Sequence, residues 1–500
     1  MAQRVVGLAG KIIWIAFKVL LALLVILIPI LGVWFASSIA AFWNGPIWLV
    51  VVSGLFFFPV LPLLWEWRGA AWFNKRVANT PPTREPPERI LTFFDRLVLR
   101  TLAINLSLLV ALGLAFPEEG FKAVSTRGDW MLDNVEGQWV DHTRDVLFAT
   151  ADGLEWLYAM AHDDPFDEFA ETTGVVPGAD ERGQIETVIA DTVDTKEDTP
   201  EKDEEALPEG PLTWPPPAML HPLVVNMPPE AEESIESVAK YILENEPDPF
   251  RRVKALFDYA ADRIAYDVPA LSLDRIPPQH AEKVFAEKKG VCSGYALLLT
   301  ALGEHTGDEI VYIVGVSRNL SGDVGGGGHA WNAARIEGNW YLLDATWAAG
   351  NVNGDTFEKA YKPVFLFTPP EVFINTHFPD EPDWQLLDMP LSRGDYMRQP
   401  VLRPDFFANA MKLKSPTRSQ ITVRERVDVT LENPKNRFLL ANLVPRGEKE
   451  GPSCTVIQGS ESKITCFLPG PGTFQVFIYG SAKLFDTYGF WGQVEVNRGS

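Results

Sequence analysis

The sequence predicts three parts in order: a membrane region with three transmembrane helices, an α+β globular domain, and an all-β domain of the immunoglobulin-like sandwich type. Apolar residues crowd the first fifth of the chain, mixed helix and strand patterns follow an acidic central segment, and short alternating runs fill the C-terminal fifth. With 500 residues, a formal net charge of −22 and 3 cysteines, the chain is unsuited to binding nucleic acid and is not a disulfide-rich mini-protein.

Three apolar stretches are long enough to cross a membrane: residues 12–43, 45–65 and 97–116. Lys18 is the only charge in the first stretch, and Arg100 lies near the start of the third, where it can reach the interface. A cleavable signal peptide is the competing interpretation of the first stretch, but signal peptides carry only about 7–15 apolar residues. Because the stretches contain few polar residues, we expect residues 1–116 to be an anchor rather than a transporter or channel.

The distribution of basic residues predicts the orientation of this anchor. Arg4 and Lys11 precede the first stretch, and the loop between the first and second carries no Lys or Arg. The next loop is basic, with Arg68, Lys75, Arg76, Arg84, Arg89 and Arg96. Basic loops stay cytoplasmic, so we expect an integral membrane protein with a cytoplasmic N-terminus and an extracytoplasmic globular part after Phe116.

Two segments are expected to connect the anchor to the globular part. Recurring apolar residues between Trp130 and Met160 predict an amphipathic helix within a stalk at 117–162, lying on the membrane or pairing with a neighbour. Residues 163–217 are acidic, rich in Pro and Thr, and poor in apolar periodicity, which predicts a disordered linker. Such a tether would leave the globular part free to search near the membrane.

The predicted domain at 218–395 contains a cysteine at the start of a helix. The segment GVCSGYA passes directly into the apolar run LLLTAL, which puts Cys292 at or just before the helix N-terminus. Unpaired amide N–H groups at that position favour a thiolate. A single cysteine is more often an inert core residue, so this position needs partners before it indicates chemistry.

Two predicted strands supply those partners. HAWNAARIEG begins at His329, NWYLLDATW contains Asp344, and a turn at Glu337-Gly338 joins them as a hairpin that brings the two side chains together. A thiolate nucleophile needs an imidazole to carry its proton, and a carboxylate fixes the tautomer of that imidazole. Cys292, His329 and Asp344 are therefore the candidate catalytic residues.

These motifs resemble the transglutaminase-like superfamily, whose fold is related to papain-like cysteine proteases. The later run YKPVFLFTPPEVFINTHFPDEPDWQLL resembles an extension found in kyphoscoliosis peptidase-type proteins. The resemblance covers about residues 220–500 and leaves the membrane region as an addition. It implies that Cys292 is a nucleophile, His329 a general acid/base and Asp344 an orienting group, in attack on an amide carbonyl through an acyl-enzyme.

Other polar residues near these motifs receive less specific predictions. The oxyanion needs a donor besides the Cys292 amide, for which Gln279 is a weak candidate. Trp331 shares a face with His329 if the strand is regular and then shields its imidazole. His280, His305 and His377 are expected at the surface or as helix caps. No two cysteines are spaced CxxC and the glycines 325–328 lack a following Lys-Ser/Thr, so we expect no metal or cofactor and interpret those glycines as a flexible loop.

Alternating runs separated by turns predict a β-sandwich at 396–500. Cys454 and Cys466 flank the turn GSES on neighbouring strands, close enough for a disulfide in an oxidising space, with two buried thiols as the alternative. The domain has no acid/base cluster and is expected to bind or pack.

We therefore expect a membrane-anchored cysteine peptidase or amidase that acts on peptide or protein amides outside the cytoplasm. An amine-accepting transamidase that cross-links proteins is the alternative enzyme. A non-catalytic envelope scaffold, in which Cys292, His329 and Asp344 are relics of an active ancestor, is the alternative from another class of protein.

Overall fold

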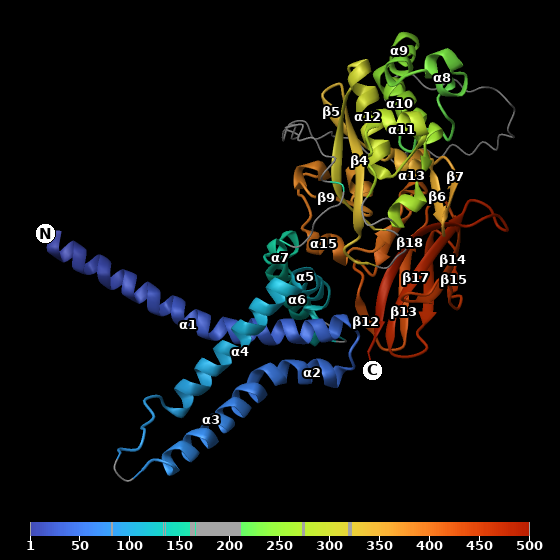
Figure 1. Cartoon of the computed structure of the whole chain (residues 1–500). Helices are drawn as coiled ribbons and strands as arrows, with labels where there is room; N and C mark the ends of the chain where they lie inside the picture. Colours follow the sequence, from blue (N-terminus) through green and yellow to red (C-terminus); the bar gives the residue numbers. More distant parts are fainter. Residues whose placement is uncertain are drawn as a thin grey trace.

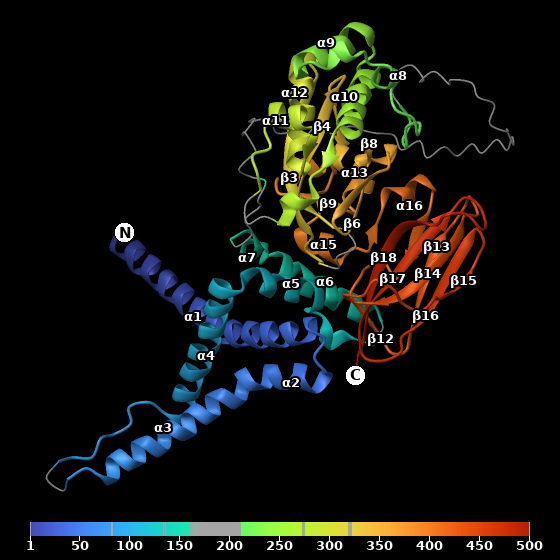
Figure 2. The same cartoon turned by 45° about the vertical axis from the view of Figure 1, so that its right-hand side comes forward.

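The computed structural model of the chain describes residues 2–81, 84–133, 135, 137–160, 166, 212–272, 276–318 and 323–499. Long apolar helices extend to one side, a group of short helices follows them, and a mixed α/β domain and a β-sandwich lie beyond (Figure 1, Figure 2). Most of the expected acidic linker lies outside the described residues. Its last residues pack on the mixed domain, where Trp214 Nε1 donates to the Val364 carbonyl oxygen at 3.0 Å.

Three apolar helical stretches are long enough to cross a membrane, as predicted: Lys18–Phe42, Ile47–Ala78 and Phe93–Ala115. They belong to α1 (Ala2–Phe42), α2 (Ile47–Leu55), η1 (Phe56–Val60), α3 (Leu61–Ala78) and α4 (Phe93–Ala115). The second stretch continues beyond its expected end, because Lys75 and Arg76 in the last turn of α3 suit the negative end of the helix dipole.

A buried carboxylate joins the second and third stretches. Glu66 of α3 accepts hydrogen bonds from Arg96, with Nη2 at 2.8 Å, and from Arg100, both on α4, while Arg89 lies at 3.6 Å. Arg100, expected to reach the membrane interface, therefore pairs with Glu66. Pairing offsets the desolvation of a charge in apolar surroundings.

The expected stalk is several short helices rather than one long helix. They are α5 (Pro117–Arg127), η2 (Trp130–Leu132), α6 (Gln138–Asp152) and α7 (Glu155–Ala159). Gly137 precedes α6 with a φ of 131°, a backbone conformation that favours glycine, and Gly153 follows its end. The helices pack on the second half of α1, where Trp34 Nε1 donates to the Gly128 carbonyl oxygen at 2.8 Å. The stalk thus pairs with neighbouring helices.

Two arginines, one buried and one half-buried, fasten the globular part to this stalk. Arg398 pairs with Asp152 of α6 at 2.9 Å and donates to the Ser125 carbonyl oxygen of α5 at 3.0 Å. Arg418 pairs with the buried Asp129 at 2.7 Å. Because leaving one partner of a buried ion pair alone is strongly unfavourable, these contacts oppose the free search expected of a tethered domain.

The mixed domain surrounds a five-stranded antiparallel sheet of order β8-β5-β4-β3-β9. Its helices and strands in chain order are α8 (Pro222–Val225), η5 (Pro229–Glu232), α9 (Ile235–Asn245), α10 (Pro249–Arg263), β1 (Ala265–Tyr266), η6 (Val268–Ser272), α11 (Ala281–Glu287), β2 (Lys289–Gly290), α12 (Cys292–Thr306), β3 (Glu309–Ser317), β4 (Gly327–Ile336), β5 (Asn339–Leu343), α13 (Ala345–Ala349), β6 (Gly350–Asn353), β7 (Thr356–Lys359), η7 (Pro363–Phe365), β8 (Leu366–Thr368), α14 (Pro370–Phe373), β9 (His377–Pro379), η8 (Pro382–Gln385) and α15 (Arg393–Arg398). The apolar helix α12 packs against β3 and β4, with Leu298, Leu299 and Leu302 in the domain core.

The expected hairpin joins β4 and β5. Glu337 and Gly338 form its turn with φ values of 52° and 87°, as a tight two-residue hairpin turn requires. The register pairs Asn332 with Leu343. His329 near the start of β4 and Asp344 just after β5 therefore come to the same end of the sheet.

The C-terminal region is a sandwich of two antiparallel sheets, as the alternating runs predict. Its elements are β10 (Val401–Leu402), α16 (Pro404–Ala408), β11 (Lys412–Ser415), β12 (Ile421–Val423), β13 (Arg426–Glu432), β14 (Phe438–Pro445), β15 (Thr455–Ile457), β16 (Glu461–Phe467), β17 (Gly472–Ser481) and β18 (Gly489–Arg498). The sheets have the orders β10-β18-β17-β14 and β11-β13-β16-β15, with β12 added in parallel to β18. Val429, Ile464 and Val476 lie in the core between them. Cys454 and Cys466 form a disulfide.

Candidate active site

Cys292 is the first residue of α12 and is 1% exposed. The buried side chain of Gln279 holds the backbone before it: its Oε1 accepts the Val291 N–H at 3.0 Å, and its Nε2 donates to the Pro277 carbonyl oxygen at 2.8 Å. A Cβ on Gly294 would lie 2.6 Å from that Oε1, so the glycine of the GVCSG motif leaves room for the amide. These bonds make Gln279 a support of the helix start.

His329 and Asp344 meet at the end of the sheet, as the hairpin predicts. His329 Nε2 lies 2.9 Å from Asp344 Oδ2, and both side chains are buried. Asp344 is also the N-cap of α13, where its Oδ1 accepts the Trp347 N–H at 3.0 Å. On the opposite face of β4, Asn332 Nδ2 donates to the Ala296 carbonyl oxygen at 3.0 Å and so fastens the strand to α12.

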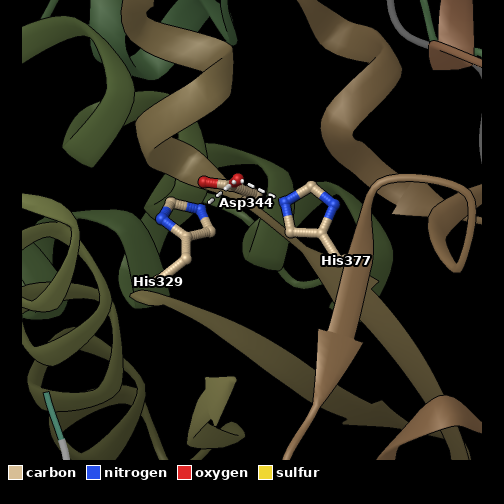
Figure 3. A group of neighbouring side chains, drawn as sticks. All are labelled: His329, Asp344 and His377. Carbon is tan, nitrogen blue, oxygen red and sulfur yellow. Dashed lines mark hydrogen bonds and ion pairs between the residues drawn. The ribbon is translucent and has the colours of Figure 1, made fainter. Parts of the chain in front are cut away.

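A second histidine, missed in the sequence, shares this carboxylate. His377 Nε2 lies 3.0 Å from Asp344 Oδ2, on the other side from His329 (Figure 3). Its Nδ1 is 2.9 Å from Thr376 Oγ1, and its ring stacks on Phe373 with centroids 4.0 Å apart. The expectation that His377 lies at the surface or caps a helix is wrong, because β9 pairs with β3 and buries it completely. His280 and His305 are exposed, as expected.

The charges of these three groups depend on one another. Burial lowers the pKa of His329, but the Asp344 carboxylate and a hydrogen bond with Cys292 outweigh it and raise that pKa to about 10. Burial raises the pKa of Asp344, yet His329 and the N–H groups of both imidazoles hold it well below its usual range. Burial lowers the pKa of His377 to about 4, and the positive charges of His329 and Arg403 act in the same direction. At neutral pH the site therefore holds an imidazolium, a carboxylate and a neutral imidazole.

This protonation state assigns the tautomer of the second histidine. The neutral His377 ring donates its Nε2–H to Asp344, so its Nδ1 accepts the hydroxyl proton of Thr376. One carboxylate oxygen thus accepts N–H bonds from two rings held on different strands. A carboxylate that accepts two such hydrogen bonds is fixed in orientation and stays ionised.

Aromatic rings enclose the imidazoles. Trp331 lies on the same side of β4 as His329 and stacks beside it with centroids 5.9 Å apart, as a regular strand predicts. Trp347 lies 5.6 Å from His329 and 4.6 Å from His377, and the Arg403 guanidinium sits 4.4 Å over its ring. These rings exclude water, which strengthens the electrostatic coupling between His329 and Asp344.

The glycine-rich loop before His329 is attached to the stalk. Asp323 Oδ1 lies 3.2 Å from Lys122 Nζ of α5, and a Cβ on Gly325 would lie 2.7 Å from Lys122 Cε. Gly326 has a φ of 82°, which favours glycine. The loop residues from 323 onward thus rest on helix α5 of the stalk beside the candidate site.

In the part of the chain that the structure describes, one group of buried donor atoms matches a metal site by residue type. The donors of His329, Asp344 and His377 lie within 4.8 Å of one another. Two imidazoles and a carboxylate suit a divalent transition metal. Here the same atoms are joined by hydrogen bonds between the two imidazoles and the carboxylate, so the set fits a hydrogen-bonded acid/base group better.

Residues 236–345 match the family model described as "Transglutaminase-like superfamily". The chain therefore carries a transglutaminase-like domain, and Cys292, His329 and Asp344 all fall within the matched residues.

Relatives match over half of the chain. "Kyphoscoliosis peptidase" of Mus musculus is 26% identical over 266 residues, covering 51% of this chain and 40% of the relative. The protein of that name from Homo sapiens is 26% identical over 267 residues, with the same two shares. This chain thus spans about two fifths of their length. A solved structure, "Crystal structure of a TGase", is 17% identical and covers 28% of this chain and 37% of that one, with a TM-score of 0.20 that supports no structural argument.

Proposed function

We propose that this protein is a cysteine amidase that cleaves peptide or protein amides through an acyl-enzyme, with Cys292 as nucleophile, His329 as general acid/base and Asp344 as the group that orients His329. The observation that carries the proposal is the coupling of one imidazole to both a helix-start cysteine and a buried carboxylate. An inert cysteine has no need of either partner. The transglutaminase-like match supports the same assignment.

The chemistry follows from these roles. The Cys292 thiolate attacks the amide carbonyl carbon, a C–S bond forms, and the carbonyl electrons move to oxygen next to the Cys292 backbone N–H. As the C–N bond breaks, the His329 imidazolium gives its proton to the leaving amine. His329 then takes a proton from water, which attacks the thioester and releases the acid and the thiolate. An amine in place of that water gives transamidation.

His377 is proposed as a positioning residue, because it touches neither the sulfur nor the site of attack. Its N–H bond to Asp344 Oδ2 orients the carboxylate toward His329, and its neutral state adds no competing charge. A residue that hydrogen-bonds to the partner of a reacting imidazole commonly fixes the orientation of that imidazole and adjusts its basicity.

The membrane region is proposed to hold the catalytic domain outside the cytoplasm. The basic loop between α3 and α4 lies at the end of the helices away from the globular part, whereas the α1–α2 turn lies beside that part (Figure 1). Basic loops stay cytoplasmic, so the two observations together favour an extracytoplasmic site. A disulfide in the sandwich suits an oxidising space.

A digest of a peptide library by the full chain in detergent micelles tests the proposed activity. Wild type should release new amino termini, Cys292→Ala should not, and His305→Ala, an exposed change on the same helix, should match wild type. Adding a primary amine separates the two enzymes: incorporation into product in place of new termini would favour the transamidase. If neither wild type nor Cys292→Ala releases new amino termini or incorporates the amine, the non-catalytic scaffold is favoured.

A further inference from the structure

The proposed nucleophile is buried in a cluster that includes a residue from outside the transglutaminase-like match. Cys292 belongs to a buried apolar cluster, here called the sulfur cluster, whose other members are Phe166, Ala270, Val291, Ala296 and Ala330. Phe166 is 3% exposed although it precedes the matched residues by a long stretch of chain. Because Cys292 is 1% exposed, a substrate carbonyl cannot reach its sulfur in this state.

Phe166 is held through its main chain as well as its ring. The Tyr312 hydroxyl on β3 donates to the Phe166 carbonyl oxygen at 3.2 Å, across 146 residues of sequence. An apolar side chain in a pocket, combined with a hydrogen bond to the main-chain carbonyl, is how extended peptides are recognised. Phe166 thus makes the two contacts that a bound peptide residue would make.

The walls of the pocket indicate what it accepts. Ala270, Ala296 and Ala330 contribute only methyl groups, which leaves space for a ring, and the half-buried Ile276 and Val314 pack against the cluster. Apart from Cys292, the proposed thiolate, the described members all have uncharged side chains. Burying a charged side chain there without a partner would be strongly unfavourable.

We propose that Phe166 occupies the substrate's own subsite, which accepts a large neutral apolar side chain next to the scissile amide, and that Phe166 must leave before Cys292 reacts. The inference rests on the proposed function for the identity of the substrate. The covering of Cys292 itself is testable without turnover. Phe166 then acts as an internal competitor, so that peptides with aromatic or large aliphatic residues displace it and charged ones do not.

Alkylation of Cys292 by iodoacetamide in the full chain, read by mass spectrometry, tests this directly. Replacing Phe166 by Ala should raise the rate about 10-fold or more, because burial of such a ring is worth that factor. Phe485→Ala, a change at an exposed ring of the sandwich, is the matched control and should leave the rate unchanged. Phe166→Trp keeps the pocket filled and should not raise the rate, which distinguishes uncovering from general loosening.

Protection completes the test. Peptides with a central Phe or Leu should slow alkylation of the Phe166→Ala protein, and peptides with Asp or Lys there should not. An unchanged rate in Phe166→Ala, or equal protection by both kinds of peptide, would overturn the inference even if the enzyme cleaves amides. Faster alkylation with selective protection but no turnover would uphold the subsite and count against the proposed function alone.

Discussion

Replacing Asp344 with Asn should change how Cys292 reacts with pH. The carboxylate is the main group that raises the pKa of His329 to about 10 against the opposite effect of burial. Without it, burial remains and the pKa should fall below the ordinary value of about 6.5. At about pH 7.5 the imidazolium fraction then drops from about 99% to below about 10%.

The consequence is a change in both rate and profile, because the reaction of Cys292 depends on the charge of His329. In wild type the imidazolium persists from about pH 6 to 9, so it should assist alkylation across that range. Asp344→Asn should react about 10-fold more slowly at neutral pH, because its His329 is largely neutral there. Turnover should fall further, by about 10²–10⁴-fold, since the His329 tautomer is also lost.

The assay is pseudo-first-order alkylation of the full chain, quantified on the Cys292 peptide. Asp405→Asn is the control, because Asp405 lies on α16 in the C-terminal region and is not among the groups that shift the pKa of His329. Equal thermal transitions of the two variants exclude unfolding. Superimposable pH profiles of wild type and Asp344→Asn would refute the coupling of His329 to Asp344.

Four further predictions follow from other features of the structure. His377→Gln keeps an N–H donor near Asp344 and should lower kcat less than about 10-fold, whereas His377→Leu should lower it about 100-fold with KM unchanged. The pKa of His377 is lower in the folded protein than in the unfolded chain, so stability should fall by about 3 kcal/mol as pH drops from 6.5 to 4, a loss absent in His377→Gln and measurable by thermal unfolding. Arg398→Met leaves the Asp152 carboxylate without its ion-pair partner and should destabilise the contact between the stalk and the globular part by about 2–3 kcal/mol. Proteolysis after α6 should then be faster, and an unchanged rate of proteolysis would contradict this prediction. The proposed orientation can be tested in intact cells that express the protein with Cys292 replaced by Ala and one new exposed cysteine. A membrane-impermeant maleimide should label Lys435→Cys but not Asn79→Cys, and the reverse pattern would contradict the proposed orientation.

Local sequence patterns were sufficient for much of the fold. The apolar stretches predict membrane-length helices because no other structure satisfies their backbone in lipid. The passage from GVCSG into LLLTAL locates Cys292 at a helix start. The Glu337-Gly338 turn predicts that His329 and Asp344 meet, since a two-residue turn leaves a hairpin little choice of register.

The missed features depend on pairing between distant segments. His377 reaches Asp344 only because β9 pairs with the edge of β3. The local spacing of apolar residues in the sequence does not predict this pairing. The apolar residues on both sides of it, in FINTHFP, were the available signal of burial. Phe166 lies in an acidic stretch whose composition indicates a solvated linker, and a single ring in such a stretch carries no periodicity.

The stalk shows the same limit in another form. Its recurring apolar residues predict one helix, although Gly137 and Gly153 in the same stretch are natural breaks. Its docking depends on ion pairs such as Arg398–Asp152, whose partners are 246 residues apart. From the sequence alone, charged residues so far apart are expected to lie on a solvated surface, because nothing local indicates that they form an ion pair.

The most direct test of the central claim is the mass of the protein during reaction with an activated acyl donor. We predict a thioester adduct on the peptide that contains Cys292 in wild type, cleaved by hydroxylamine, absent in Cys292→Ala and strongly reduced in His329→Ala. The Phe166→Ala protein should form it faster. An adduct at another residue, or none even in Phe166→Ala, would contradict the assignment of Cys292 as the nucleophile.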